Sequence, residues 1–197
     1  MPTIDTINRE IARELGAQRF DLTADGLYLP RMGALAVGEY WGRVNGGAWE
    51  KEGNNRIVTE GYALMLSVSL SQSPKPSGLY LAICSGTTAP ADNWTAATYA
   101  ATASEIVSMT EGHTGATRPV WTPPNSVAIG TIDNYASPAA LTIATAGTLT
   151  VTGAAMLTNA QRGGTTGALI NASLFNTPRT FQNGDKYDLG YRVSLGN

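Results

Sequence analysis

A strict two-residue alternation in residues 186–195 is the feature that most constrains the fold of this chain. Within it Tyr, Leu, Tyr, Val and Leu alternate with Lys, Asp, Gly, Arg and Ser. A period of two over ten residues is typical of a β-strand with one apolar and one polar face. The segment therefore predicts a strand and is the clearest indication of a β-rich fold.

Further strands are expected upstream of this one. Turn sequences separate them, among them Ala146-Gly147 and Asn183-Gly184-Asp185. Several short strands at such spacing favour a mainly β fold, an antiparallel β-sandwich or jelly-roll-like domain. The connection 85–125 is long for a simple loop and is expected to make contacts of its own. The other expected strands are residues 79–84, 126–130, 140–145, 148–157 and 167–175.

A short amphipathic helix is expected at residues 3–15. Its apolar positions form one stripe, because they recur at spacings of three and four. A helix of this length is marginal alone in water, so the stripe needs a surface to pack on. We expect this surface to belong to a neighbouring protein; the body of the same chain is the alternative. The stripe consists of Ile4, Ile7, Ile11 and Leu15.

A second helix is expected at residues 58–70, with Thr59 as its N-cap. Tyr62, Leu66 and Leu70 lie on one face of it. The Ser- and Pro-rich residues 71–76 end it.

The first part of the chain is expected to form an N-terminal helix and extended arm at 1–57, followed by a β-sandwich domain at 58–197. Two short strands are candidates within the arm, at 26–29 and 40–44. Frequent Gly and Pro residues interrupt this region. A strand pair inside the main domain is the alternative interpretation of the same residues.

Charge is scarce in this chain. Charged residues make up 14% of the sequence, against roughly 25% in typical proteins. The net charge of −2 and the pI near 5.4 give no electrostatic basis for binding nucleic acid or a membrane surface. No stretch has the pattern of a signal peptide or a membrane-spanning helix, which predicts synthesis and folding in a cytoplasm.

Reactive groups are equally scarce. We therefore expect that the protein is not an enzyme and that it binds no cofactor or metal. Cys84 is the single cysteine and His113 the single histidine. Cys84 lies in an apolar run and is expected to be a buried hydrophobic residue; His113 lies in a polar segment and is expected at the surface. One His and one Cys cannot form a zinc site of the usual kind, and nothing in the sequence around them supports a catalytic dyad.

A sugar-processing enzyme with two carboxylates is the enzymatic alternative. It would draw its acid and base from the sparse acidic residues of the β region, although their spacing gives no signal. These residues include Glu105, Glu111, Asp133 and Asp185.

Aromatic residues are the other candidates for contacts, because Trp and Tyr are enriched at interfaces. Burial within the chain is the alternative for each of them. Together with the N-terminal stripe, the candidate assembly contacts are Ile4, Ile7, Ile11, Leu15, Tyr40, Trp41, Trp94 and Trp121.

Several short segments follow one another over residues 27–197 in a characteristic order. They are residues 29–33, 40–44, 58–70, 78–83, 116–121, 151–157 and 167–172, with Phe175, Pro178-Arg179 and Gly184-Asp185. In this order the sequence resembles a family of small structural proteins of tailed bacteriophages. The helix expected at 3–15 has no counterpart in the resemblance.

The resemblance implies a virion structural protein, a decoration or cement protein on the capsid surface. Its partners would be the major capsid protein and copies of itself in a homo-oligomer, with no nucleic acid and no membrane. A charge-poor, Thr-rich set of strands suits such packing, because neighbouring copies would not repel one another. The alternative is a tail, adaptor or receptor-binding component of the virion that binds a host glycan.

Overall fold

The computed structural model describes residues 20–22, 28–30, 35–124 and 130–196. The helix expected at 3–15, with Ile4, Ile7, Ile11 and Leu15, lies outside the described residues. Most of the strand expected at 126–130 lies outside them as well. Within the first unit of the chain, β1 (Phe20–Leu22) and β2 (Tyr28–Pro30) pair antiparallel.

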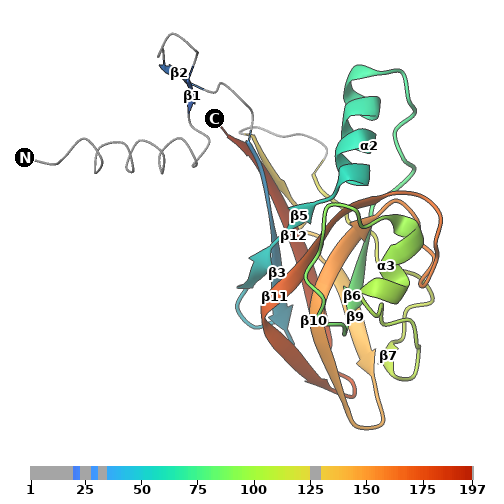
Figure 1. Ribbon diagram of the computed structural model, residues 1–197. Helices are drawn as coiled ribbons and strands as arrows, with labels where there is room; N and C mark the ends of the chain where they lie inside the picture. The colour runs from blue at the N-terminus through green and yellow to red at the C-terminus, as the bar shows by residue number, and fades with distance from the viewer. Residues whose placement is uncertain (1–19, 23–27, 31–34, 125–129, 197) are drawn as a thin grey trace, which may run out of the picture. The chain divides into compact units, whose positions relative to one another are not determined.

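The second unit, residues 36–195, contains two antiparallel sheets (Figure 1). The four-stranded sheet has the order β5-β11-β10-β6, and the six-stranded sheet includes the order β4-β3-β12-β9-β7, with β8 also paired to β12. The prediction of a mainly β, sandwich-like fold is therefore confirmed. The strands are β3 (Leu35–Val44), β4 (Glu50–Asn54), β5 (Arg56–Ile57), β6 (Tyr80–Cys84), β7 (Gly112–His113), β8 (Thr131–Asp133), β9 (Ala139–Ala144), β10 (Thr148–Leu157), β11 (Leu169–Gln182) and β12 (Lys186–Gly196).

The expected boundary at 57/58 does not coincide with that of the compact unit, which begins at Ala36. Residues 36–57 form β3, β4 and β5, and these strands pair within the two sheets. The alternative of strands inside the main domain is thus the arrangement found. The reason is the side chain of Tyr40 in β3, which is fully buried between the sheets and cannot belong to an exposed arm.

The main core lies between the two sheets. Leu81 and Ile83 of β6 face this core, whereas Ala82 and Cys84 face the opposite side of the same sheet. A strand buried on both faces has a continuous apolar run and no alternation, as residues 80–84 do. The second face is covered by α3 (Ala96–Thr102), whose Tyr99 is buried against it.

Helix α2 (Thr59–Leu70) confirms the second expected helix. It projects at one end of the sandwich, whereas α3 lies beside β6 and β10 (Figure 1). The N-cap residue is Val58, and no side chain caps the helix. The expectation that Thr59 is the N-cap is therefore wrong, because Thr59 is already the first helical residue.

Candidate functional site

Helix α2 exposes large apolar side chains along one side. Tyr62 is 51% exposed, Leu66 59% and Leu70 83%, and they follow one another at four-residue spacing. In a soluble protein such a ridge at helical spacing normally faces the core. We call the exposed positions of this helix its outer face: Thr59, Tyr62, Ala63, Met65, Leu66, Ser69 and Leu70.

The opposite side of α2 is apolar as well. Leu64 packs against the core between the sheets, and Leu64 and Val68 line a cavity of about 230 Å³ beside Trp121. Gly61 lies so close to β11 that a Cβ atom at this position would overlap the carbonyl oxygen of Ile170. A helix that is apolar on both sides is typical of one buried on both sides. Within the described part of the chain, only the inner side of α2 is covered.

The one charged residue of α2 is used inside the molecule. The Glu60 carboxylate accepts hydrogen bonds of 2.7 Å from the backbone N–H of Ala96 and of Leu169. It thereby joins α2 to the start of α3 and to β11. The outer face of α2 therefore carries no charge.

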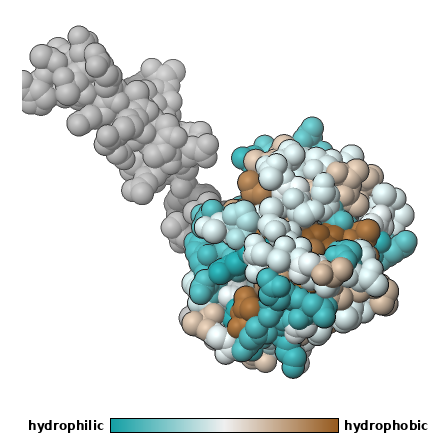
Figure 2. Space-filling model, turned by 90° about the horizontal axis from the view of Figure 1, so that it is seen from below, coloured by the Kyte–Doolittle hydropathy of each residue, from teal (hydrophilic) through white to brown (hydrophobic). Residues whose placement is uncertain are grey.

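The opposite end of the sandwich has a different surface. Figure 2 views the molecule from the side away from α2 and shows mostly hydrophilic or weakly polar residues, with small separate apolar patches. Isolated apolar residues of this kind are normal on a protein surface. The outer face of α2 is distinguished from them because its apolar residues are contiguous along one helix.

Two of the aromatic residues predicted to make assembly contacts are core residues of the monomer. Tyr40 is fully buried, and its hydroxyl donates a 2.6 Å hydrogen bond to the side-chain oxygen of Asn171. Trp94 is 7% exposed and packs near Tyr99 beneath α3. The prediction that Tyr40 and Trp94 contact a partner is therefore wrong, because the chain itself covers both side chains.

The other two predicted aromatic contacts are partly buried. The Trp121 indole donates a 3.1 Å hydrogen bond to the carbonyl oxygen of Tyr191. The Trp41 indole donates one of 3.3 Å to Glu39, and the Arg192 guanidinium lies 5.8 Å from the ring centre. Both residues are engaged within the chain, and of the two only Trp121 lies near α2.

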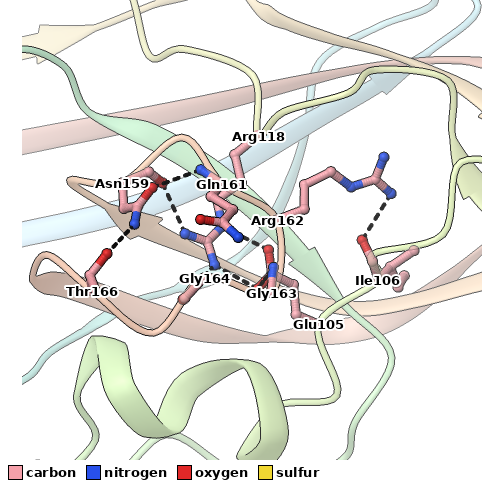
Figure 3. Close-up of polar contacts among 9 residues, drawn as sticks. All are labelled: Glu105, Ile106, Arg118, Asn159, Gln161, Arg162, Gly163, Gly164 and Thr166. Carbon is pink, nitrogen blue, oxygen red and sulfur yellow. Dashed lines mark hydrogen bonds and ion pairs between the residues drawn. The ribbon is translucent and has the colours of Figure 1, made fainter.

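A buried ion pair lies within the long segment 85–124, and further hydrogen bonds of its two side chains join this segment to the loop between β10 and β11 (Figure 3). The Arg118 guanidinium donates two hydrogen bonds to the Glu105 carboxylate, at 2.7 and 2.6 Å, and both side chains are 1% exposed. Arg118 also donates to the carbonyl oxygen of Asn159, at 2.9 Å. The backbone N–H of Gly163 donates to Glu105, at 3.1 Å. Because these partners occupy both carboxylate oxygens, the pair forms a structural link and not a reactive centre.

Arg162 anchors the same segment from another side. Its guanidinium donates hydrogen bonds to the carbonyl oxygens of Ser108, at 2.6 Å, and of Ile106, at 3.1 Å. It also donates to those of His113, at 2.9 Å, and of Gly115. No local pattern in the sequence predicts these contacts, because the accepting groups are backbone carbonyls that lie 47 to 56 positions away from Arg162 in the chain.

A second carboxylate, Glu52, is buried between the sheets and is also paired. It accepts hydrogen bonds from the Arg179 guanidinium, at 2.8 and 3.0 Å, and from the Tyr187 hydroxyl, at 3.1 Å. Burial raises the pKa of Glu52, while Arg179 opposes this shift. Its partners lie on β11 and β12, so Glu52 of β4 joins the two sheets through side-chain hydrogen bonds.

The single cysteine and the single histidine are both buried. Burial raises the pKa of the Cys84 thiol to about 11 and lowers the pKa of His113 to about 4. At neutral pH the thiol is therefore protonated and the imidazole uncharged, which is unfavourable for a thiolate nucleophile. The expectation that Cys84 is buried is confirmed. The expectation that His113 lies at the surface is wrong: it is 4% exposed, in β7, which pairs with β9.

We predict that His113 makes the protein less stable in mild acid. The unfolded chain binds a proton at His113 near pH 6.5, whereas the folded chain does so only near pH 4. The free energy of unfolding should therefore fall as the pH decreases through this window. Urea denaturation at pH 7 and at pH 4.5 measures the loss, which should be smaller in His113→Gln. An equal loss in both proteins would show that His113 does not cause it.

Two further carboxylates of the enzymatic alternative, Glu111 and Asp185, are hydrogen-bonded within the chain. Glu111 accepts hydrogen bonds from Thr145 and from the N–H of Ala146. Asp185 accepts from Asn45 and from the N–H of Gln182, and these bonds lower the pKa values of both carboxyl groups. Among the described residues no group of three or more His, Cys, Asp and Glu side chains could hold a metal ion.

The sequence matches no protein-family model and no curated protein. None of the helices in the described part of the chain is long and apolar enough to cross a membrane.

Proposed function

We propose that the protein is a structural component of a tailed-bacteriophage virion, a decoration protein that binds the capsid surface and copies of itself. The observation that carries this proposal is the outer face of α2, an uncharged apolar surface on a helix whose other side already contacts the sandwich through Gly61 and Leu64. That the assembly is a phage virion is inferred from the resemblance of residues 27–197 to phage structural proteins.

The physical demands of a decoration protein fit this chain. A protein that binds a lattice in many copies holds by multivalency, so each contact can be small. It needs a rigid body, and Arg118 and Arg162 join the long segment 85–124 to such a body. The reactive groups described above are buried or paired, which favours an assembly role over catalysis.

A tail, adaptor or receptor-binding position is the second candidate. Val107 and Met109 are about half exposed, at 49% and 50%, on the segment that Arg162 anchors. Exposed apolar residues on a rigid loop suit a contact surface. In this position, the number of copies of the protein per virion would equal the number of subunits in a tail or portal ring.

Purified virions test the proposal. We predict that quantitative mass spectrometry finds the protein in a copy number comparable with that of the major capsid protein, and that gold-labelled antibodies decorate the head. A copy number that matches a single tail or portal ring would contradict the decoration role. Absence from virions would contradict both candidates.

A further inference from the structure

We propose that the cavity beside Trp121 binds a small, mostly apolar organic molecule with one hydrogen-bond acceptor, such as a ketone oxygen, and that Asn171 recognises this acceptor. The inference goes beyond the proposed function and does not depend on it. Three observations on the described residues support it: the place of the cavity, its apolar lining and the unpaired amide nitrogen of Asn171.

The cavity lies where the two sheets meet helix α2. Ile57, Asn171 and Met156 line it from the four-stranded sheet, and they are direct cross-strand partners on β5, β11 and β10. Tyr191 and Val193 of β12 line it from the six-stranded sheet, and the inner side of α2 covers it. Ligand pockets are common at the mouths of β-barrels, which is a comparable position.

The lining of the cavity is mostly apolar and sets the size of a ligand. The volume is about 230 Å³, and an apolar cavity of about 150 Å³ is large enough to hold benzene. The cavity therefore has room for one aromatic ring with a short substituent. Among the lining residues that the structure describes, the one with a charge is Lys75, and it is exposed. The buried part of the cavity thus favours an uncharged ligand.

The side chain of Asn171 supplies a polar group within this apolar lining. It is fully buried, and its oxygen accepts the 2.6 Å hydrogen bond from the Tyr40 hydroxyl, which orients the amide. The amide nitrogen has no hydrogen-bond partner within the described part of the chain. A buried donor without a partner is unfavourable. A ligand that brings an acceptor into the cavity removes this cost.

The other polar side chains of the lining are paired or exposed. The Trp121 indole N–H is bound to the carbonyl oxygen of Tyr191, and the Tyr191 hydroxyl accepts a 2.9 Å hydrogen bond from Asn55. A buried water usually makes about three hydrogen bonds, which a mostly apolar lining with one unpaired donor does not supply. An organic acceptor needs only the bond from Asn171, and its apolar body contacts the rest of the lining.

A matched pair of ligands tests the inference. Acetophenone carries a ketone oxygen, and α-methylstyrene has the same shape with a methylene group in place of that oxygen. In NMR titrations of the isotope-labelled full-length chain, both ligands should saturably shift the methyl signals of Leu64, which lines the cavity. Acetophenone should also shift the side-chain amide signals of Asn171, and α-methylstyrene should shift them much less.

A double variant isolates the hydrogen bond. Tyr40→Phe/Asn171→Leu removes both partners of a buried pair together, so that neither is left unpaired. The ratio of the acetophenone Kd to the α-methylstyrene Kd should be about tenfold lower in the wild-type chain than in this variant, which is the effect of one buried hydrogen bond. Comparing ratios cancels the difference in hydration between the two ligands.

A second pair of variants locates the binding site. Val68→Phe places a larger side chain in the cavity lining and should abolish binding of both ligands. Leu70→Phe is the matched control, because Leu70 is 83% exposed on the other side of the same helix, and it should bind both ligands like the wild-type chain.

The inference is overturned if neither ligand causes a saturable shift at Leu64 and Asn171. It is also overturned if the two Kd values have the same ratio in the wild-type chain and the double variant, since the cavity would then bind apolar molecules without help from Asn171. If the double variant does not fold, the wild-type titrations decide: equal shifts of the Asn171 amide by both ligands would contradict the inference. These outcomes do not involve virions, so the proposed function is tested separately.

Discussion

Replacing Arg118 by methionine is expected to lower the free energy of unfolding by about 3–5 kcal/mol, the usual loss when one partner of a buried ion pair is removed. The variant keeps most of the side-chain volume but leaves the Glu105 carboxylate buried without its guanidinium partner. It also removes the donor that satisfies the carbonyl oxygen of Asn159. Urea denaturation at neutral pH, followed by circular dichroism, measures the loss.

The control for this prediction is the exposed ion pair of Arg56 and Asp92, whose side chains are 52% and 69% exposed. Solvent screens such a pair, so Arg56→Met should cost much less than Arg118→Met. The double variant Glu105→Leu/Arg118→Met should recover part of the stability, because no uncompensated charge remains buried. Equal losses from the two arginine variants would contradict the structural role of Arg118.

The strands that the sequence predicts best are those with a local signal. The alternation of residues 186–195 becomes β12 (Lys186–Gly196). The apolar run 79–84 becomes β6, and the segment 148–157, where Thr alternates with Leu and Val at its start, becomes β10. Burial demands these patterns, because a strand with one or two buried faces must place apolar residues on each of them.

The second half of β11 lacks such a signal. Residues 176–182 include Pro178 and several polar residues, yet the strand continues to Gln182. Its partners are the first residues of β10, with Thr148 opposite Gln182. Backbone pairing with a neighbouring strand holds this part in the sheet, and a pattern within one segment does not reveal its partner.

The short helix α3 is not predicted from the sequence, for a related reason. Helix α3 has seven residues, mostly Ala and Thr, and no apolar stripe. Its start is fixed by reciprocal hydrogen bonds between Thr95 and Thr98 and by the distant carboxylate of Glu60. This last contact spans 36 residues, so no local pattern predicts it.

The proposed contact surface on α2 was predicted only in part. The apolar face formed by Tyr62, Leu66 and Leu70 follows from helical spacing alone. The exposure of this face does not follow from the spacing, because the opposite side of α2 is apolar too. In the structure Leu64 and Val68 on that side face the body of the domain. A helix with apolar residues on both sides is itself a signal for two covered faces. This pattern favours α2, and not Tyr40 or Trp94, as the surface for a partner.

The outer face of α2 gives the second prediction with a large effect. Leu66 is 59% exposed, so Leu66→Lys should leave the unfolding midpoint nearly unchanged. At a buried interface the same change places an unpaired charge in an apolar contact, which is strongly unfavourable. The variant should therefore fold normally and fail to assemble.

Thr165→Lys is the matched control, since it adds the same charge at an exposed position that is not part of α2. Both variants are compared with the wild-type chain in one assay, co-sedimentation with purified phage particles that were produced without this protein. Bound protein is quantified in the pellet, and the fold of each variant is checked by circular dichroism.

This co-sedimentation assay is the most direct test of the claim that the protein works through the outer face of α2 in a virion. The account predicts that the wild-type chain and Thr165→Lys sediment with the particles, whereas Leu66→Lys stays in the supernatant. Attachment of Leu66→Lys equal to that of the wild-type chain would contradict the claim.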